Sequence, residues 1–189
     1  ARALRRPSVP PGCTVDNSKS EVSGGVRGGG VAGSNPRSER LEVRVDRDGQ
    51  RHRMAFVRGK TVKKLEVLGK TKETGTTVRF KPDPEIFSVL EYNYNTLADR
   101  LRQLAFLNKG VTITLTDERP ESAKTETFFA KGGLVQFVEW LNRNKKPLHP
   151  KPIAFCATRY DVEVDLALQY ETGYNENTIT FVNNITTNN

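Results

Sequence analysis

Alternation of apolar and polar positions begins at Leu41, and this alternation predicts β-strands. The segment 41–46 alternates residue by residue, Asp48-Gly49 is typical of a tight hairpin turn, and 51–57 returns as a second strand. A less regular strand is expected at 62–68 and a β-branched one at 76–80. Further strands are expected at 111–117, 125–130, 153–158, 162–170 and 178–183.

Two segments change to helical spacing. Asn95 or Thr96 can cap a helix that carries Leu97, Leu101 and Leu104 on one face and ends at 108–110. A second amphipathic helix begins after Gly132-Gly133 and is expected to end near 142–146. The order of elements predicts an α+β sandwich, with a mainly antiparallel sheet covered by helices on one face, followed by the start of another.

Residues 1–38 show no apolar periodicity of either kind, but they contain five glycines within 24–30. Such a loop can direct several backbone N–H groups at one phosphate. The same composition is also typical of a flexible linker. Gly33 and Pro36 disfavour the helix that a phosphate loop needs behind it, so the residues alone leave both interpretations open.

The formal net charge of +8 lies mainly in residues 1–60, which hold 13 basic and 6 acidic residues. A basic half favours nucleic acid or phosphorylated ligands, and a stripe along the first hairpin is one candidate contact surface: Arg44, Arg51, Arg53 and Arg58. The alternative is that these arginines only solvate an exposed strand face. No apolar run approaches the length of a membrane span.

Nucleophilic and metal chemistry have no support in the sequence. Cys13 and Cys156 lie far apart without a neighbouring base, and His52 and His149 are isolated. We therefore expect no disulfide framework, no metal site and no catalytic triad.

Specific strings in a consistent order carry a resemblance to a known family. They include 41–43 (LEV), 72–76 (KETGT), 78–80 (VRF), 104–110 (LAFLNKG), 141–145 (LNRNK), 147–150 (PLHP), 167–170 (ALQY) and 181–185 (FVNNI). With these strings the chain resembles the ATPase region of the B subunits of bacterial type II DNA topoisomerases, gyrase first and topoisomerase IV as the alternative. Upstream, 16–19 and 22–25 also match, whereas 1–15 match nothing in the family.

The resemblance implies the GHKL (Bergerat) ATPase fold. Residues 39–130 would be the C-terminal part of that ATPase domain, and 131–189 the start of an α+β transducer domain. Residues 1–38 would be irregular, disordered or corrupted by a reading-frame error, with a remnant ATP lid at 22–39. Arg27 and Gly29 replace a histidine and a valine of the family pattern.

By the same resemblance, ATP would be bound by two groups of residues. The phosphate loop would be Gly25, Val26, Arg27, Gly28, Gly29 and Gly30. Thr76 would lie beside the adenine and Arg47 at the mouth of the pocket. The family's catalytic glutamate, magnesium ligand and adenine-binding aspartate would precede this chain, and its γ-phosphate lysine would follow it. The chain would then contain no catalytic residue and no metal ligand, and we expect no ATP hydrolysis from it alone.

The parent protein implied by the resemblance couples ATP binding and hydrolysis, with Mg²⁺, to DNA strand passage and negative supercoiling. Its partners would be DNA, the gyrase A subunit in an A2B2 assembly, and a second B subunit that dimerises with nucleotide. It would act in the bacterial cytoplasm, away from membranes. A non-catalytic basic module that binds nucleic acid through residues 1–60 remains the alternative from another class.

Overall fold

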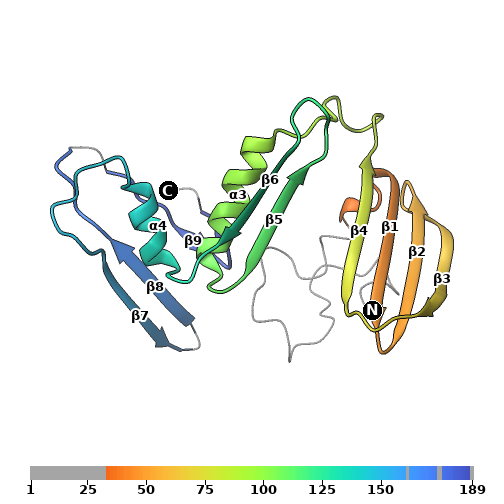
Figure 1. The fold of residues 1–189 in the computed structure, drawn as a ribbon, viewed down its shortest axis with the longest axis horizontal. Helices are drawn as coiled ribbons and strands as arrows, with labels where there is room; N and C mark the ends of the chain where they lie inside the picture. The colour runs from red at the N-terminus through yellow and green to blue at the C-terminus, as the bar shows by residue number, and fades with distance from the viewer. Residues whose placement is uncertain (1–32, 161, 174–175, 188–189) are drawn as a thin grey trace. The chain divides into compact units, whose positions relative to one another are not determined.

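The computed structural model describes residues 33–160, 162–173 and 176–187. The chain divides into two compact units, residues 1–91 and 92–189 (Figure 1). Each unit has its own secondary structure and its own buried residues.

The described residues of the first unit include a four-stranded antiparallel sheet. Its strands are β1 (Ser38–Arg47), β2 (Gln50–Val57), β3 (Lys60–Lys70) and β4 (Gly75–Pro82), in the spatial order β3-β2-β1-β4. Two-residue turns close both hairpins, Asp48-Gly49 with φ of 55° and 75° and Arg58-Gly59 with φ of 47° and 80°. These left-handed conformations match the twist of paired strands, which is why aspartate and glycine fit here.

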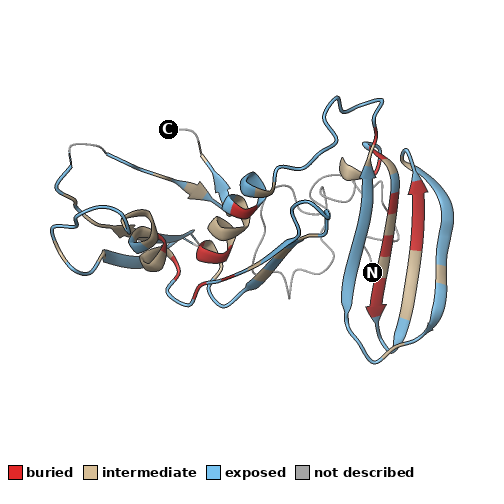
Figure 2. Ribbon diagram, turned by 45° about the horizontal axis from the view of Figure 1, so that its top comes forward, coloured by how far each residue is buried: buried red, intermediate tan, exposed pale blue. Residues whose placement is uncertain are grey.

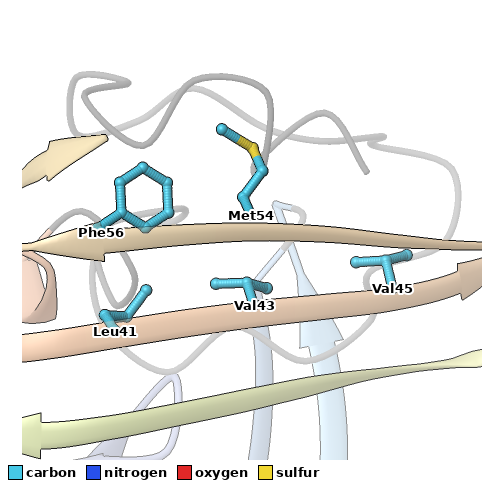
Figure 3. Packing of buried hydrophobic residues seen from close by; sticks show 5 residues of the cluster. All are labelled: Leu41, Val43, Val45, Met54 and Phe56. Carbon is cyan, nitrogen blue, oxygen red and sulfur yellow. The ribbon is translucent and has the colours of Figure 1, made fainter. Parts of the chain in front are cut away.

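Alternation along the strands gives this sheet one apolar and one charged face. Leu41, Val43 and Val45 on β1 lie with Met54 and Phe56 on β2 in one buried cluster, and Figure 3 shows the five side chains on the same side of the two strands. Figure 2 shows the same buried stretches on β1 and β2. The intervening residues of both strands are mostly charged.

The second unit combines two helices with three β-hairpins. Its elements are α3 (Tyr94–Leu107), β5 (Thr112–Asp117), β6 (Lys124–Phe129), α4 (Leu134–Leu141), β7 (Ile153–Arg159), β8 (Val162–Leu168), β9 (Phe181–Val182) and β10 (Ile185–Thr186). The pairs β5–β6, β7–β8 and β9–β10 are all antiparallel.

Both helices bury their apolar stripes within this unit. Ala98 and Ala105 of α3 pack with Phe128 of β6. Phe106 at the end of α3 stacks on Phe137 of α4, with ring centroids 5.1 Å apart. The helical spacing in the sequence therefore reports a packed core.

The expected α+β class and antiparallel pairing are confirmed, with three corrections. The cap of α3 is Asn93 rather than Asn95 or Thr96, because the Asn93 side chain accepts a hydrogen bond from the Thr96 backbone N–H at 3.1 Å. The strand expected at 178–183 is reduced to β9, because Asn183 and Asn184 form the turn of a short hairpin. The described strands form one four-stranded and three two-stranded sheets rather than one main sheet, and α3 and α4 pack on β5, β6 and β8 and on each other.

Candidate functional site

Two of the sequence-predicted site residues lie at the same end of the four-stranded sheet. Arg47 is the last residue of β1, immediately before the Asp48-Gly49 turn, and Thr76 is the second residue of β4. Thr76 pairs directly with Val45, two positions before Arg47. Because side chains alternate along a strand, Thr76, Val45 and Arg47 belong to the same face of the sheet.

This face is apolar and ends in polar groups. Val78, Val43 and Met54 form one cross-strand row, and the next row toward the sheet end is Thr76, Val45 and His52. The rows place a threonine hydroxyl and an imidazole on either side of the buried Val45. This row is therefore apolar at its centre and polar at both ends.

His52 is a residue that the sequence analysis missed. Its Nδ1 atom is buried and has no hydrogen-bond partner within the described part of the chain. A buried imidazole nitrogen without a hydrogen-bond partner raises the free energy of the folded chain. A ligand that supplied a donor or acceptor to this nitrogen would remove that cost. The available signal was register: Asp48-Gly49 as a two-residue turn places residue 52 opposite residue 45.

Arg47 is free to reach a ligand. Its side chain is half-exposed, and within the described part of the chain its one ion pair is to the highly exposed Asp48, with Nε 3.5 Å from Oδ2. Ion pairs of this kind on a protein surface contribute little and are readily exchanged. The structure therefore leaves the Arg47 guanidinium available at the rim of the apolar face.

An ion-pair network on the opposite face fixes the backbone around these residues. Arg51 donates from Nε and Nη2 to the two carboxylate oxygens of Asp46, at 2.6 and 3.1 Å, and from Nη2 to Glu73 at 3.2 Å. The hydrogen bond from Arg51 holds the pKa of the Asp46 carboxyl below its usual value. Glu73 belongs to the segment that leads into Thr76, so the network ties β4 to the first hairpin.

A second link joins the same two segments through the backbone. The Thr71 N–H donates to the Gly49 carbonyl at 3.0 Å, and the Thr71 hydroxyl accepts from the Glu73 N–H at 3.1 Å. The segment before β4 is thereby anchored to the turn that follows Arg47. The Thr71–Gly49 bond and the Asp46–Arg51–Glu73 network thus hold together the end of the sheet that carries Arg47 and Thr76. We call these contacts the staple.

The glycine loop assigned to phosphate, Gly25 to Gly30, lies outside the described residues. The described chain begins with the helical residues Gly33 and Ser34 and enters β1 at Ser38. Asn35 donates to the Gly59 carbonyl at 3.5 Å, and Ser38 Oγ donates to the Ser34 carbonyl at 2.7 Å. The Asn35 bond attaches this segment to the β2–β3 turn, and the Ser38 bond closes a turn within the segment.

The predicted arginine stripe is largely engaged with acids. Arg51 binds Asp46, Arg53 binds Glu42 at 2.6 Å, and Arg58 binds the buried Asp83 at 2.7 Å. Arg44 donates to the Thr77 hydroxyl at 3.4 Å. These four arginines therefore do not form a stripe of free cations in the structure.

Other candidate chemistry has limited geometry. Cys156 is an exposed free thiol whose pKa is raised by its hydrogen bond to the Glu163 carboxylate. Among the described residues, no group of three or more histidine, cysteine or acidic side chains could hold a metal ion. Within the same residues, no helix has the length and apolar character to cross a membrane.

Comparison with known proteins adds independent information. A family model described as DNA gyrase B matches residues 133–189. The chain is 46% identical over 168 residues to the DNA gyrase B subunit of Staphylococcus epidermidis, covering 88% of this chain and 26% of that protein. It is 43% identical over 177 residues to the DNA gyrase B subunit of Bacillus mycoides, covering 93% of this chain and 44% of that protein. The chain thus spans less than half the length of these relatives.

Solved structures agree with the sequence relatives. The 43K ATPase domain of Thermus thermophilus gyrase B, in complex with an aminocoumarin, superposes with a TM-score of 0.75 at 37% identity, over 84% of this chain and 43% of that one. The B-subunit of the DNA gyrase from Myxococcus xanthus gives a TM-score of 0.79 at 22% identity, over 98% of this chain and 53% of that one, and supports the fold alone. The described residues are therefore an α+β fragment of the GHKL fold.

Proposed function

Since this chain belongs to the DNA gyrase B family, we propose that its four-stranded sheet forms one wall of the ATP site of a type II DNA topoisomerase. The observation that carries the proposal is the shared face of Thr76, Val45 and Arg47. These are a hydroxyl, an apolar surface and a cation at one sheet end. The relatives named above are gyrase B proteins, which favours gyrase over topoisomerase IV.

The residues present fit two parts of ATP, first the adenine ring and then the charged part that lies at the mouth of the site. The apolar floor at Val43 and Val45 suits the adenine ring, and the Thr76 hydroxyl lies in the same row as Val45. The Arg47 guanidinium at the rim suits the charged part of a nucleotide. Gly25 to Gly30 would supply backbone N–H groups to the triphosphate as the remnant lid.

Bound ATP would supply the phosphoryl group whose transfer to water drives the parent enzyme. The role of Thr76, Val45 and Arg47 in that reaction is to bind and orient the nucleotide. None of them is placed to activate water, and we assign no Mg²⁺ ligand within this chain. We therefore expect the 189-residue chain to bind nucleotide without hydrolysing it.

For the parent protein we propose the family's activity: strand passage in DNA with ATP, together with the gyrase A protein and a second copy of the gyrase B protein, in the bacterial cytoplasm. In that assembly residues 39–130 would belong to the ATPase domain, and 131–189 would start the transducer domain. Arg27 and Gly29 depart from the pattern that the resemblance implies, so the lid would be the least typical part of the proposed site.

Two adjacent threonines give a matched test of the nucleotide site. Thr76→Val removes a hydroxyl from the proposed site, whereas Thr77→Val makes the same change on the opposite face of β4, where Thr77 pairs with Arg44. Losing one hydrogen bond to ligand should weaken ATP binding about fivefold in Thr76→Val. Thr77→Val should bind ATP with the same affinity as the unsubstituted 189-residue chain. Titration calorimetry measures both affinities.

Equal affinities in the two variants would contradict the assigned face. A parent chain that binds no ATP would contradict the proposed site itself. Phosphate release measured on the same samples should stay at the level of buffer, and turnover would refute the expectation that the chain is not hydrolytic.

A further inference from the structure

A groove lies on the charged face of the four-stranded sheet, opposite the proposed nucleotide face. It has a volume of about 530 Å³. Besides Phe80, its lining consists of six charged residues of β1, β2 and β4: Glu39, Arg40, Glu42, Arg53, Arg79 and Lys81. Four of these six side chains are basic. No role has been given to this groove by the site described above.

Both carboxylates of the groove are already paired. Glu42 accepts from Arg53 at 2.6 Å and lies 4.0 Å from Arg40, and Glu39 binds Lys81 at 2.7 Å. Arg79 stands directly opposite Glu42 in the β1–β4 register. Among the described residues, however, Arg79 has no ion pair, so the groove keeps an excess of positive charge centred on it.

Repulsion between arginines points the same way. Arg44 and Arg53 are directly opposite across β1 and β2, and like charges in that position are destabilising. Each also keeps a buried Nε without a hydrogen-bond partner in the described part of the chain. An anion bound to this face would offset the repulsion and draw the two guanidinium groups into better geometry.

The side chains suit phosphate groups arranged along a backbone. Guanidinium forks bind phosphate oxygens in bidentate fashion. Arg79 and Lys81 are alternate residues of one strand, so their Cα atoms are about 7 Å apart on the same face, and their long side chains can contact separate phosphates of one backbone. Arg40 and Lys81 are also well exposed, with 65% and 66% of their side-chain surface accessible, so a continuous polymer can reach them.

We infer that this groove binds the sugar-phosphate backbone of DNA, with Arg79 as the central contact. Binding there is independent of base sequence, because every contact is to phosphate. The inference rests on the proposed function in taking DNA as the partner, but it concerns a surface separate from the nucleotide site. Its test contains no ATP, so either proposal can fail without the other.

The test measures the affinity of the full 189-residue chain for a short fluorescein-labelled DNA duplex by anisotropy over a range of salt concentrations. Arg79→Gln removes the central charge and no ion pair. Arg159→Gln, on β7 of the second unit, is the matched control with the same change of charge. Arg79→Lys keeps the positive charge but lacks the guanidinium group that binds phosphate in bidentate fashion. Circular dichroism verifies that all variants are folded.

We expect Arg79→Gln to weaken binding roughly threefold or more and to lower the slope of log affinity against log salt by about 0.9. Arg159→Gln should match the parent chain, and Arg79→Lys should keep the parent's salt slope. Since residues 1–32 are common to all variants, only differences between variants report on the groove.

Three results would overturn the inference. The first is equal DNA binding by Arg79→Gln and Arg159→Gln, or no binding by the parent chain. The second is competition by polyglutamate as strong as that by DNA at equal charge, which would assign the groove to an acidic protein. The third is displacement of DNA by inorganic phosphate at matched ionic strength, which would assign it to a small anion.

Discussion

Asp46 and Arg51 face each other across the first hairpin, and their bidentate pair ties the end of the sheet together. The hydrogen bond from Arg51 is the main reason that the pKa of Asp46 is lowered. A carboxyl group with a lowered pKa in the folded state binds fewer protons there than in the unfolded state. It therefore stabilises the fold at neutral pH, and this contribution is lost as the pH falls.

We predict a pH-dependent difference between the parent chain and Asp46→Asn. At pH 7 the variant should melt at a lower temperature, because it cannot form the charged pair. Below the ordinary aspartate pKa of about 3.9 the difference should shrink, because Asp46 in the parent chain becomes protonated as the pH approaches its lowered value. Thermal melts at pH 7, 5 and 3 test this, and a difference that stays constant across this range would contradict it.

At the scale of single residues, the sequence predicted which side chains are buried better than which ones meet. Alternation identified Leu41, Val43 and Val45 as an inward face, and the structure buries all three. It could not show that His52 lies beside Val45, because that depends on the pairing of two strands. It also could not show that Arg53 is paired with Glu42, since the two are eleven residues apart.

At the scale of elements, Gly133 decides how α4 begins. Its backbone has φ of 59° and ψ of −134°, a conformation open essentially to glycine alone, and it precedes the helix without a side-chain cap. A Cβ atom there would also overlap the Lys109 side chain. The glycine pair in the sequence thus marks an entry into the helix that only glycine adopts without strain.

Gly133→Ala should destabilise the chain by about 1–3 kcal/mol, since alanine must adopt a strained backbone and displace Lys109. Gly173→Ala is the matched control, because Gly173 has no left-handed backbone and an added Cβ would meet only ordinary contacts with Glu171. Urea denaturation of both variants measures the difference in unfolding free energy. Equal stability would show that the entry to α4 can relax.

Element types were predictable, whereas element ends were not. Helical spacing gave α3, but Asn93, Asn95 and Thr96 are all good caps, and only the backbone path selects Asn93. Apolar residues gave a strand near 181, but both Asn183 and Asn184 take left-handed conformations, with φ of 49° and 68°, and turn the chain. Local composition allows several residues to end a helix or a strand, and tertiary packing selects which of them does.

At the scale of the whole molecule, the β7–β8 hairpin carries an uncovered apolar face. Register places Phe155 opposite Leu166 and Ile153 opposite Leu168 on one side. Four apolar residues of the hairpin expose about half of their surface or more: Ile153, Phe155, Val162 and Val164. Contiguous exposed apolar surface of this kind promotes association.

The chain should therefore self-associate as its concentration rises. Phe155→Lys places a charge on the apolar face and should lower the association constant about tenfold, as expected for losing one buried aromatic contact. Thr158→Lys adds the same charge on the opposite face, where Glu163 can pair with it, and should leave association unchanged. Sedimentation velocity over a range of concentrations separates these outcomes, and equal behaviour of both variants would place the association elsewhere.

The stapled end of the sheet has a consequence for any ligand that touches both Arg47 and Thr76. The β2–β3 hairpin separates these residues in the sequence, yet the Thr71–Gly49 bond and the Asp46–Arg51–Glu73 network hold their backbones together before a ligand arrives. The conformational entropy of bringing the two contacts together is thus spent during folding rather than during binding. Severing the staple should lower affinity for such a ligand even though neither contact is altered, so the strength of binding is encoded partly in residues that never meet the ligand.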